Sequence, residues 1–540
     1  MTRTVHQVFS ATAARTPEAD FLFIELVTAA AYGIAPGAIR WGDAAAEVER
    51  LRAAYEEAGY GHGHRVGLLL ENRPAFLFHW LALNALGASA VPINADMRAA
   101  ELSYLIGHSE IGLAVTLPER ANDLQAAAAT AGIDFVTMTA DAAIPRARTA
   151  PPRGGEPIGA DTECALLYTS GTTGRPKGCI LSNTYFVNAG EWYAALDGVC
   201  SVRRDAERLM TPLPLTHMNA MACSTMVVLV AGGCLVQLDR FHPKSWLQSA
   251  RESGATIVHY LGVMPAMLLS APPSAADREH AIRWGFGAGV DRKNHALFEE
   301  RFGFPLVEAW AMTETGTAAC IMANHEPRLV GESCFGRQEA FVEIKLLDDR
   351  GHEAAVGAPG ELLVRSAGSD PRRAFFSGYL KDEAATQEAW AGGWFHTGDL
   401  VRRDADGNFF FVDRKKNVIR RSGENISAVE VESVLNQHPA VKSSAVAATP
   451  DAVRGDEVLA CIVLREDADA QARQQIATSI VEHALAQLAY YKAPGYVAFI
   501  DALPLTPSQK IQRGELRTLA QTLPSQAHCI DTRFMKKRQG

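Results

Sequence analysis

The sequence predicts an α/β protein in which helices cover mostly parallel sheets. Helix-like and strand-like segments alternate along the chain, and the strand-like segments are continuous apolar runs. Such runs are typical of parallel strands that are buried on both faces of a sheet. A chain of 540 residues is too long for one hydrophobic core, so two or more domains are expected.

The N-terminal part supplies the first elements of this alternation. Ala44–Ala58 predicts a helix, because Val48, Leu51 and Tyr55 recur at helical spacing on one side. Three further segments predict, in order, a buried strand, a helix and a strand: Arg65–Leu70, Phe76–Leu86 and Ala88–Ile93.

The longest apolar stretch, Met221–Leu235, contains Ser224 and Thr225 and is too short to span a membrane. It predicts a buried helix that runs into a strand. Stretches rich in proline and glycine predict loops at Pro145–Gly159 and Pro272–Pro273.

The charge balance and the cysteines restrict the function. A formal net charge of −9 argues against a general nucleic-acid-binding protein, so an anionic ligand needs local cations. Nine scattered cysteines without a Cys-x-x-Cys pair predict reduced thiols in a cytoplasmic protein. The N-terminus lacks the apolar core of a signal peptide. The basic tail around Lys536 is expected to be a solvated terminus rather than a lipid contact.

One segment has the composition of a polyphosphate site. Residues 168–178 are Tyr-Thr-Ser-Gly-Thr-Thr-Gly-Arg-Pro-Lys-Gly, and they follow the apolar run Ala165–Leu167. Glycines free backbone N–H groups, while hydroxyls, Arg175 and Lys177 add donors and positive charge, all of which suit phosphates. The segment is not a Walker A loop, because Pro176 stands where that loop needs a glycine.

This loop resembles the phosphate loop of the acyl-adenylate-forming enzymes, which include acyl-CoA synthetases, firefly-type luciferases and peptide-synthetase adenylation domains. The resemblance extends from roughly Val48 to Leu516, and the stretch after His396 looks most like ligases for carnitine-type and other short acids. Five later segments carry it: Pro212–Ala220, Gly285–Val290, Trp310–Thr315, Gly393–Leu400 and Leu503–Arg513.

The resemblance implies a large N-terminal domain, residues 1–413, with helix-covered sheets that hold ATP and the acyl group. It also implies a small, mobile α+β C-terminal domain, residues 414–540, with a hinge near Lys416. The shift to a basic run at Asp413 independently favours a boundary at this point.

The resemblance places the nucleotide on the loop and on the strand ends. Trp310 is expected to stack on adenine, although tyrosine is usual there. Ala311 replaces a usual glycine, and its methyl group is expected to narrow the neighbouring space. Asp399 is expected to accept both ribose hydroxyls, with Arg414 nearby. The other expected ligand contacts are Thr169, Ser170, Gly171, Thr172, Thr173, Gly174, Lys177, Gly287, Ala288 and Met312, with Ser422, Gly423 and Glu424 for the thiol substrate.

The catalytic roles come from the same resemblance. Lys510 is expected to bridge the acyl carboxylate and the α-phosphate of ATP. Thr313 is expected to donate to the α-phosphate, and Glu314, with Thr169, to ligate Mg²⁺. His217 is expected to border the acyl pocket.

The expected function is an ATP-dependent ligase that joins a small carboxylic acid to coenzyme A through an acyl-AMP intermediate. Two alternatives stay open. One is an adenylating enzyme that loads a carrier protein. The other is a non-catalytic nucleotide-binding relative, which the departures at Gln509, Trp310 and Ala311 motivate, since a glycine usually precedes the catalytic lysine. The identity of the acid and the formation of a homodimer also stay open.

Overall fold

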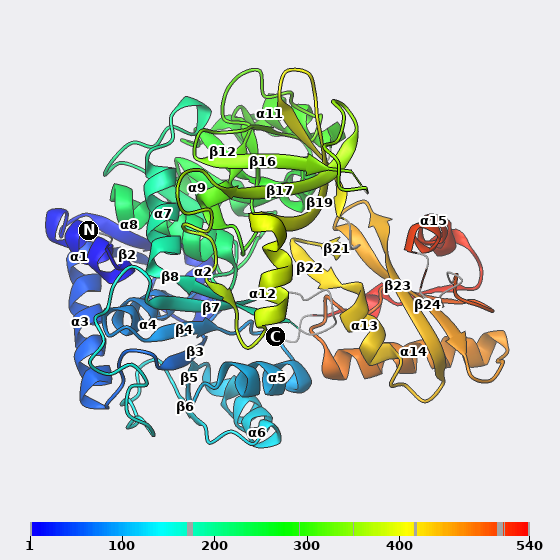
Figure 1. Ribbon diagram of the computed structural model, residues 1–540, viewed down its shortest axis with the longest axis horizontal. Coiled ribbons are helices and arrows are strands. Elements are labelled where there is room, and N and C mark those ends of the chain that lie inside the picture. Colours follow the sequence, from blue (N-terminus) through cyan, green and yellow to red (C-terminus); the bar gives the residue numbers. More distant parts are fainter. Residues whose placement is uncertain are drawn as a thin grey trace. The chain divides into compact units, whose positions relative to one another are not determined.

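A computed structural model of the chain describes residues 3–169, 176–290, 292–348, 350–414, 418–504, 511 and 513–537. The chain divides into two compact units, whose elements are labelled in Figure 1. The larger unit comprises Met1–Ala95, Ile106–Leu167 and Gly178–Val412, and the smaller comprises Asp96–Leu105, Tyr168–Lys177 and Asp413–Gly540.

The first sheet of the larger unit is mostly parallel. Its strand order is β14-β13-β12-β11-β9-β10-β1-β2, and only the edge strands β2 and β14 pair antiparallel among the described strands. The strands are β1 (Asp20–Ile24), β2 (Gly37–Arg40), β9 (Arg208–Thr211), β10 (Cys234–Gln237), β11 (Ile257–Leu261), β12 (Trp284–Ala288), β13 (Leu306–Trp310) and β14 (Ile321–Met322).

A second sheet, of order β18-β8-β7-β4-β3-β5-β6, is parallel from β7 to β6. Its strands are β3 (Arg65–Leu69), β4 (Ser89–Pro92), β5 (Leu113–Thr116), β6 (Val136–Met138), β7 (Glu163–Thr169), β8 (Lys177–Ser182) and β18 (Gly378–Tyr379). A third sheet, of order β15-β20-β19-β17-β16, contains antiparallel pairs. Its strands are β15 (Cys334–Arg337), β16 (Val342–Leu347), β17 (Pro359–Ser366), β19 (Phe395–Arg403) and β20 (Asn408–Arg414).

Helices cover both faces of the first sheet. One face packs on α9 (Trp246–Glu252), α10 (Val263–Leu269) and α11 (Arg292–Phe302). The other face packs on α7 (Asn183–Ala194), whose Tyr193 stacks on His259 of β11 with ring centroids 5.6 Å apart. The other helices of the larger unit are α1 (Val5–Arg15), α2 (Leu26–Tyr32), α3 (Trp41–Glu57), α4 (Pro74–Ala85), α6 (Ala121–Ala131), α8 (Thr225–Ala231) and α12 (Glu383–Ala389). The residues of α5 (Ala99–Ser109) are divided between the two units.

The elements expected from the sequence are present. Helix α3 covers the predicted segment, and its Val48, Leu51 and Tyr55 are buried. The apolar stretch from Met221 forms a buried helix and then β10, although it begins as a π-helix, Asn219–Ser224, which its apolar pattern did not indicate. None of the described helices has the length and apolarity needed to span a membrane.

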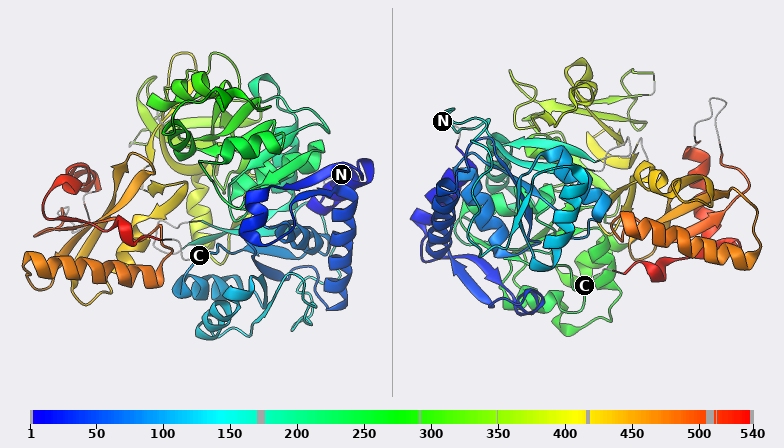
Figure 2. Two further views of the ribbon diagram at one scale, coloured as in Figure 1. Left: turned by 180° about the vertical axis from the view of Figure 1, so that it is seen from behind. Right: turned by 90° about the horizontal axis from the view of Figure 1, so that it is seen from below.

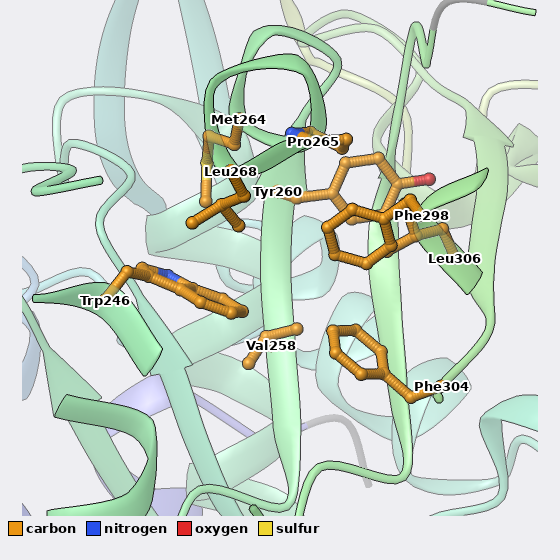
Figure 3. Close-up of a pocket in the computed structure, with 9 residues that line it drawn as sticks. All are labelled: Trp246, Val258, Tyr260, Met264, Pro265, Leu268, Phe298, Phe304 and Leu306. Atoms are coloured by element: carbon orange, nitrogen blue, oxygen red, sulfur yellow. The ribbon is translucent and has the colours of Figure 1, made fainter. Parts of the chain in front are cut away.

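Figure 3 shows a small cavity in the core of the first sheet, between β11 and the helices α9 to α11. Apolar side chains such as Trp246 and Phe298 point toward one another in it. The hydroxyl of Tyr260 donates to the main-chain oxygen of Val307 over 3.1 Å. Because the described residues that line it carry no charge, this cavity belongs to the core and does not suit a nucleotide.

The smaller unit is built on a sheet of order β22-β21-β24-β25-β26, with β23 paired to β24. Helices α13 and α14 pack on one face and α15 on the other (Figures 1 and 2). The elements are β21 (Val418–Arg421), β22 (Glu424–Ser427), α13 (Ala428–Leu435), β23 (Val441–Asp451), β24 (Gly455–Leu464), α14 (Ala470–Gln487), β25 (Tyr496–Phe499), α15 (Arg513–Thr522) and β26 (Cys529–Asp531).

The expectation of a solvated basic tail is wrong for Lys536. Its side chain is buried, and Nζ pairs with the carboxylate of Glu457, which Arg421 Nε also contacts at 2.8 Å. A single sequence does not reveal this arrangement, because the tail meets a carboxylate 79 residues earlier in the chain. Burial, followed by the nearby charge of Arg421, lowers the pKa of Lys536 to about 7.

This buried amine predicts a pH-dependent stability. In the unfolded chain Lys536 titrates near its ordinary pKa of 10.5, so between pH 7 and 10.5 the unfolded state binds more protons than the folded state. The contribution of Lys536 to the free energy of unfolding therefore rises with pH across this window and is lost as pH falls through 7. Lys536→Met keeps the apolar stem and should flatten the rise of the urea midpoint with pH. If the urea midpoint rose equally steeply with pH in the wild type and in Lys536→Met, the lowered pKa of Lys536 would be contradicted.

Candidate active site

Three expected site residues lie at one edge of the first sheet. Strands β9, β11, β12 and β13 run parallel, so their carboxyl ends share this edge. Ala288 ends β12, Trp310 ends β13, and His217 follows the end of β9. In open α/β sheets, ligands bind outside the carboxyl ends of the strands, so this edge is the candidate site.

Close packing of backbones shapes this edge. A Cβ atom at Gly287 would lie 2.2 Å from the main-chain oxygen of Tyr260, so glycine is required beside β11. Glu308 holds the loop that follows β12: its carboxylate accepts the N–H groups of Gly289 at 3.0 Å and Val290 at 2.9 Å. The sequence gives no sign of this role for Glu308, because an acidic residue inside an apolar strand carries no motif.

The structure brings two separate motifs together at Trp310 and Asp399. Trp310 Nε1 donates to Asp399 Oδ2 over 2.9 Å, although the residues are 89 positions apart. Their exposed fractions are 6% and 1%. Gly398, with φ of 68°, forms the turn before Asp399, and Thr397 Oγ1 accepts the N–H of Asp399 at 3.0 Å. The indole thus provides a hydrogen-bond donor where the usual tyrosine is absent.

Glu314 is buried and paired with a tyrosine. Tyr379 Oη donates to Glu314 Oε1 over 2.9 Å. Burial and the charge of Glu314 raise the pKa of Tyr379, so its hydroxyl remains a donor. Tyr379 lies in β18, next to β8, and no motif of the sequence indicated it.

Glu314 can contribute one ligand to a cation. No partner of its Oε2 is found among the described residues. Mg²⁺ is usually bound by one or two carboxylates together with substrate phosphates, so a single carboxylate oxygen fits. Within the described ranges, no cluster of three or more His, Cys, Asp or Glu side chains could hold a metal by itself.

The residues between Trp310 and Glu314 are accessible. Ala311 is exposed, and Met312 and Thr313 are half-buried. Ala311 is therefore a surface residue in this structure, and the effect of its methyl group on the space beside the nucleotide stays a prediction.

The phosphate-loop segment joins neighbouring strands of the second sheet. Thr169 ends β7, and Lys177 begins β8. The expected phosphate contacts that lie outside the described residues are Ser170, Gly171, Thr172, Thr173 and Gly174.

The expected thiol-substrate loop is a tight hairpin turn in the smaller unit. Ser422 and Gly423 join β21 to β22 and have φ values of 51° and 88°. Two central residues with positive φ are typical of a type I′ turn, and Glu424 follows as the first residue of β22, paired with Arg421. The side chain of Arg414 and the residues Lys416, Gln509 and Lys510 lie outside the described part of the chain.

A buried asparagine positions the loop before His217. Asn72 Nδ2 donates to the main-chain oxygen of Leu213 at 3.2 Å, and its Oδ1 accepts the N–H of Leu215 at 2.9 Å. His217 then begins a helical segment, because its main-chain oxygen accepts the N–H of Met221 at 3.1 Å. No sequence pattern marks Asn72, which lies 143 positions from the loop that it holds.

Comparison with protein families decides the identity of this fold and site. A model described as AMP-binding enzyme matches residues 9–380. This chain belongs to the AMP-binding enzyme family. A model of the C-terminal domain of AMP-binding enzymes matches residues 430–510. The family expected from the motifs and the α/β fold class are both confirmed for this AMP-binding enzyme.

Individual relatives agree with this family. The AMP-binding enzyme is 32% identical over 495 residues to sulfoacetate–CoA ligase of Cupriavidus necator, covering 89% of this chain and 92% of the relative. It is 29% identical to crotonobetaine/carnitine–CoA ligase of Shigella flexneri, covering 87% and 91%. Its fold matches o-succinylbenzoate CoA synthetase of Bacillus subtilis with a TM-score of 0.80 at 23% identity, covering 96% and 99%. The two curated relatives are acid–CoA ligases, the class that the motifs indicated.

Proposed function

We propose that this AMP-binding enzyme is an ATP-dependent acid–CoA ligase that works through an acyl-AMP intermediate. The observation that carries the proposal is the hydrogen bond of 2.9 Å between Trp310 and Asp399, because it joins an aromatic plane to a carboxylate at one sheet edge. Adenine stacks on Trp310, and the ribose hydroxyls donate to Asp399. The curated acid–CoA ligases support the same class.

The first step activates the acid. A carboxylate oxygen attacks the α-phosphorus of ATP, the bond to the β-phosphate oxygen breaks, and pyrophosphate leaves. The protein aligns two anions and neutralises them, as in other phosphoryl-transfer sites. Lys510 balances the acyl carboxylate and the α-phosphate, while Thr313 donates to the α-phosphate. Glu314 and Thr169 would hold Mg²⁺, which supplies positive charge for the leaving pyrophosphate.

The second step forms the thioester. The CoA thiolate attacks the acyl carbonyl carbon, the carbon–oxygen bond to phosphate breaks, and AMP leaves. Gly423 and Glu424 contact the thiol substrate, and Lys510 has no role here. The proposal includes the division into residues 1–413 and 414–540 and the hinge at Lys416.

The test is acid-dependent pyrophosphate release over a panel of short acids, followed by detection of the acyl-CoA product. We expect release with at least one acid and a thioester when CoA is added. Release without a thioester would favour a carrier protein as acceptor. Nucleotide binding without release for every acid would contradict a catalytic function.

Trp310→Phe is expected to raise the KM for ATP by about tenfold or more. The phenyl ring keeps the stacking but lacks the N–H that donates to Asp399, and losing a bond to a buried charged group costs roughly 1.5–3 kcal/mol. The control is Trp310→Tyr, which restores the usual aromatic residue and should stay near the wild-type KM. An unchanged KM in Trp310→Phe would show that this hydrogen bond does not position the nucleotide.

A further inference from the structure

A buried polar cluster surrounds His259 of β11. His259 is fully buried, and its Nε2 lies 2.8 Å from Tyr193 Oη of α7. Its Nδ1 lies 2.8 Å from Ser224 Oγ and 2.6 Å from Asn219 Oδ1. Asn219 is the first residue of the π-helix, and Ser224 is the last. A π-helix turn is rare and is frequent at functional sites, and this one begins two residues after His217.

The hydrogen bonds of this cluster determine which ring nitrogen carries the proton. Ser224 Oγ donates its proton to the main-chain oxygen of Asn219 over 3.3 Å, so the same Oγ must accept a proton from His259 Nδ1. Nδ1–H therefore also donates to Asn219 Oδ1, and Nε2 accepts from the hydroxyl of Tyr193. Burial lowers the pKa of His259 to about 3, so the ring is neutral near physiological pH.

This arrangement fixes the orientation of the Asn219 amide. The side-chain oxygen is held by His259, so the NH₂ group must point away from the ring. No acceptor for Asn219 Nδ2 is found among the described residues, and the side chain is only half-buried. The NH₂ group is thus an oriented donor that follows the end of β9, at the same sheet edge as Ala288 and Trp310.

We propose that Asn219 is a specificity-determining residue whose Nδ2 donates to an oxygen of the acid substrate that is not part of the reacting carboxylate. The selected substrates are short acids with a second hydrogen-bond acceptor, such as a hydroxyl, carboxylate or sulfonate group. His259 and Tyr193 are positioning residues that keep the amide in this orientation. The inference depends on the proposed ligase function, because it concerns the acid that this function uses.

The oriented NH₂ group of Asn219 should favour oxygenated acids over alkyl acids of the same shape. An alkyl acid that covered Asn219 would remove water from the NH₂ group without offering an acceptor, and leaving a buried donor unsatisfied is unfavourable. An oxygenated acid would satisfy the donor, and the oriented amide would not need to reorganise. Sites that hydrogen-bond a substrate group reject analogues lacking that group more strongly than sites that only recognise size.

The experiment compares acids of matched shape in the pyrophosphate-release assay. One pair is 4-hydroxybutyrate and pentanoate, and the other is succinate and 4-methylpentanoate. The measured quantity is the ratio of kcat/KM values within each pair. In the wild type we expect the oxygenated acid to be favoured by about tenfold or more, the equivalent of one lost hydrogen bond.

Three variants test the assignment. Asn219→Leu removes the donor, and Asn219→Asp removes it while keeping the shape, which covers a failure of the leucine variant to fold. Both should lower the ratio about tenfold while the KM for ATP stays unchanged. Tyr193→Phe keeps the ring but frees the His259 tautomer, so it should lower the ratio to a smaller extent.

The outcomes separate this inference from the proposed function. If the wild type is active but the kcat/KM ratio within each acid pair is the same in both Asn219 variants, the role of Asn219 is overturned while the ligase function stands. A wild type that releases no pyrophosphate with any acid would contradict the ligase function and, with it, the inference. Equal losses for both acids of a pair would show that Asn219 only supports the fold.

Discussion

Lys510→Ala is expected to reduce acid-dependent pyrophosphate release by about 10²–10³-fold, the usual effect of removing one group that stabilises developing charge. Adenylation brings a carboxylate against the α-phosphate, and the lysine is the cation proposed to balance both anions. The measurement is the rate of release with a saturating acid. A near-normal rate in the variant would remove Lys510 from the mechanism.

A second measurement separates this role from a loss of folding. Lys510 has no role in thioester formation, so the variant supplied with synthetic acyl-AMP and CoA should form acyl-CoA at nearly the wild-type rate. Gln509→Gly is the matched control, since it restores the glycine that usually precedes this lysine. It should keep or raise the adenylation rate, because glycine adopts positive φ without strain.

Glu457→Ala is expected to lower the free energy of unfolding by about 3–5 kcal/mol, the cost of leaving buried charges without a partner. Glu457 is fully buried, its carboxylate lies 2.8 Å from Arg421 Nε, and it also pairs with Lys536 Nζ. The substitution would leave the guanidinium of Arg421 without its carboxylate in an apolar interior, and the amine of Lys536 without a partner. Urea denaturation followed by circular dichroism measures the loss.

The matched control for this variant is Asp467→Ala in the same unit. Asp467 pairs with Arg473 at 2.8 Å, but its side chain is 91% exposed, so the pair is solvated. Exposed pairs contribute little to stability, and we expect the control to shift the urea midpoint much less than Glu457→Ala does. If the two variants lost similar amounts of unfolding free energy, burial would not be the reason that the pairs of Glu457 stabilise the fold.

The local pattern of the sequence predicted much of the fold. A helix at 44–58 was expected because apolar side chains recur at helical spacing, and a strand at 65–70 because the run is continuously apolar. They are present as α3 (Trp41–Glu57) and β3 (Arg65–Leu69). The π-helix at 219–224 was not expected, since its apolar pattern does not distinguish it from an α-helix. The side-chain hydroxyls of Ser224 and Thr225 donate to the main-chain oxygens of residues five positions earlier.

The candidate site residues could also be named from the sequence. Thr313, Glu314, Asp399 and Lys510 stand in ordered motifs, and the family match confirms the family that those motifs indicated. Their individual roles remain predictions. These residues were accessible to sequence analysis because each lies within a short segment whose order is specific.

By itself, the sequence determined the family, the α/β class and the residue types available for chemistry, because these depend on local order and periodicity. Only the tertiary structure decided the partners of the buried polar groups: Trp310 with Asp399, Tyr379 with Glu314, His259 with Asn219, and Lys536 with Glu457. The physical reason is that a buried donor or charge must find a partner, and folding supplies that partner from a distant part of the chain.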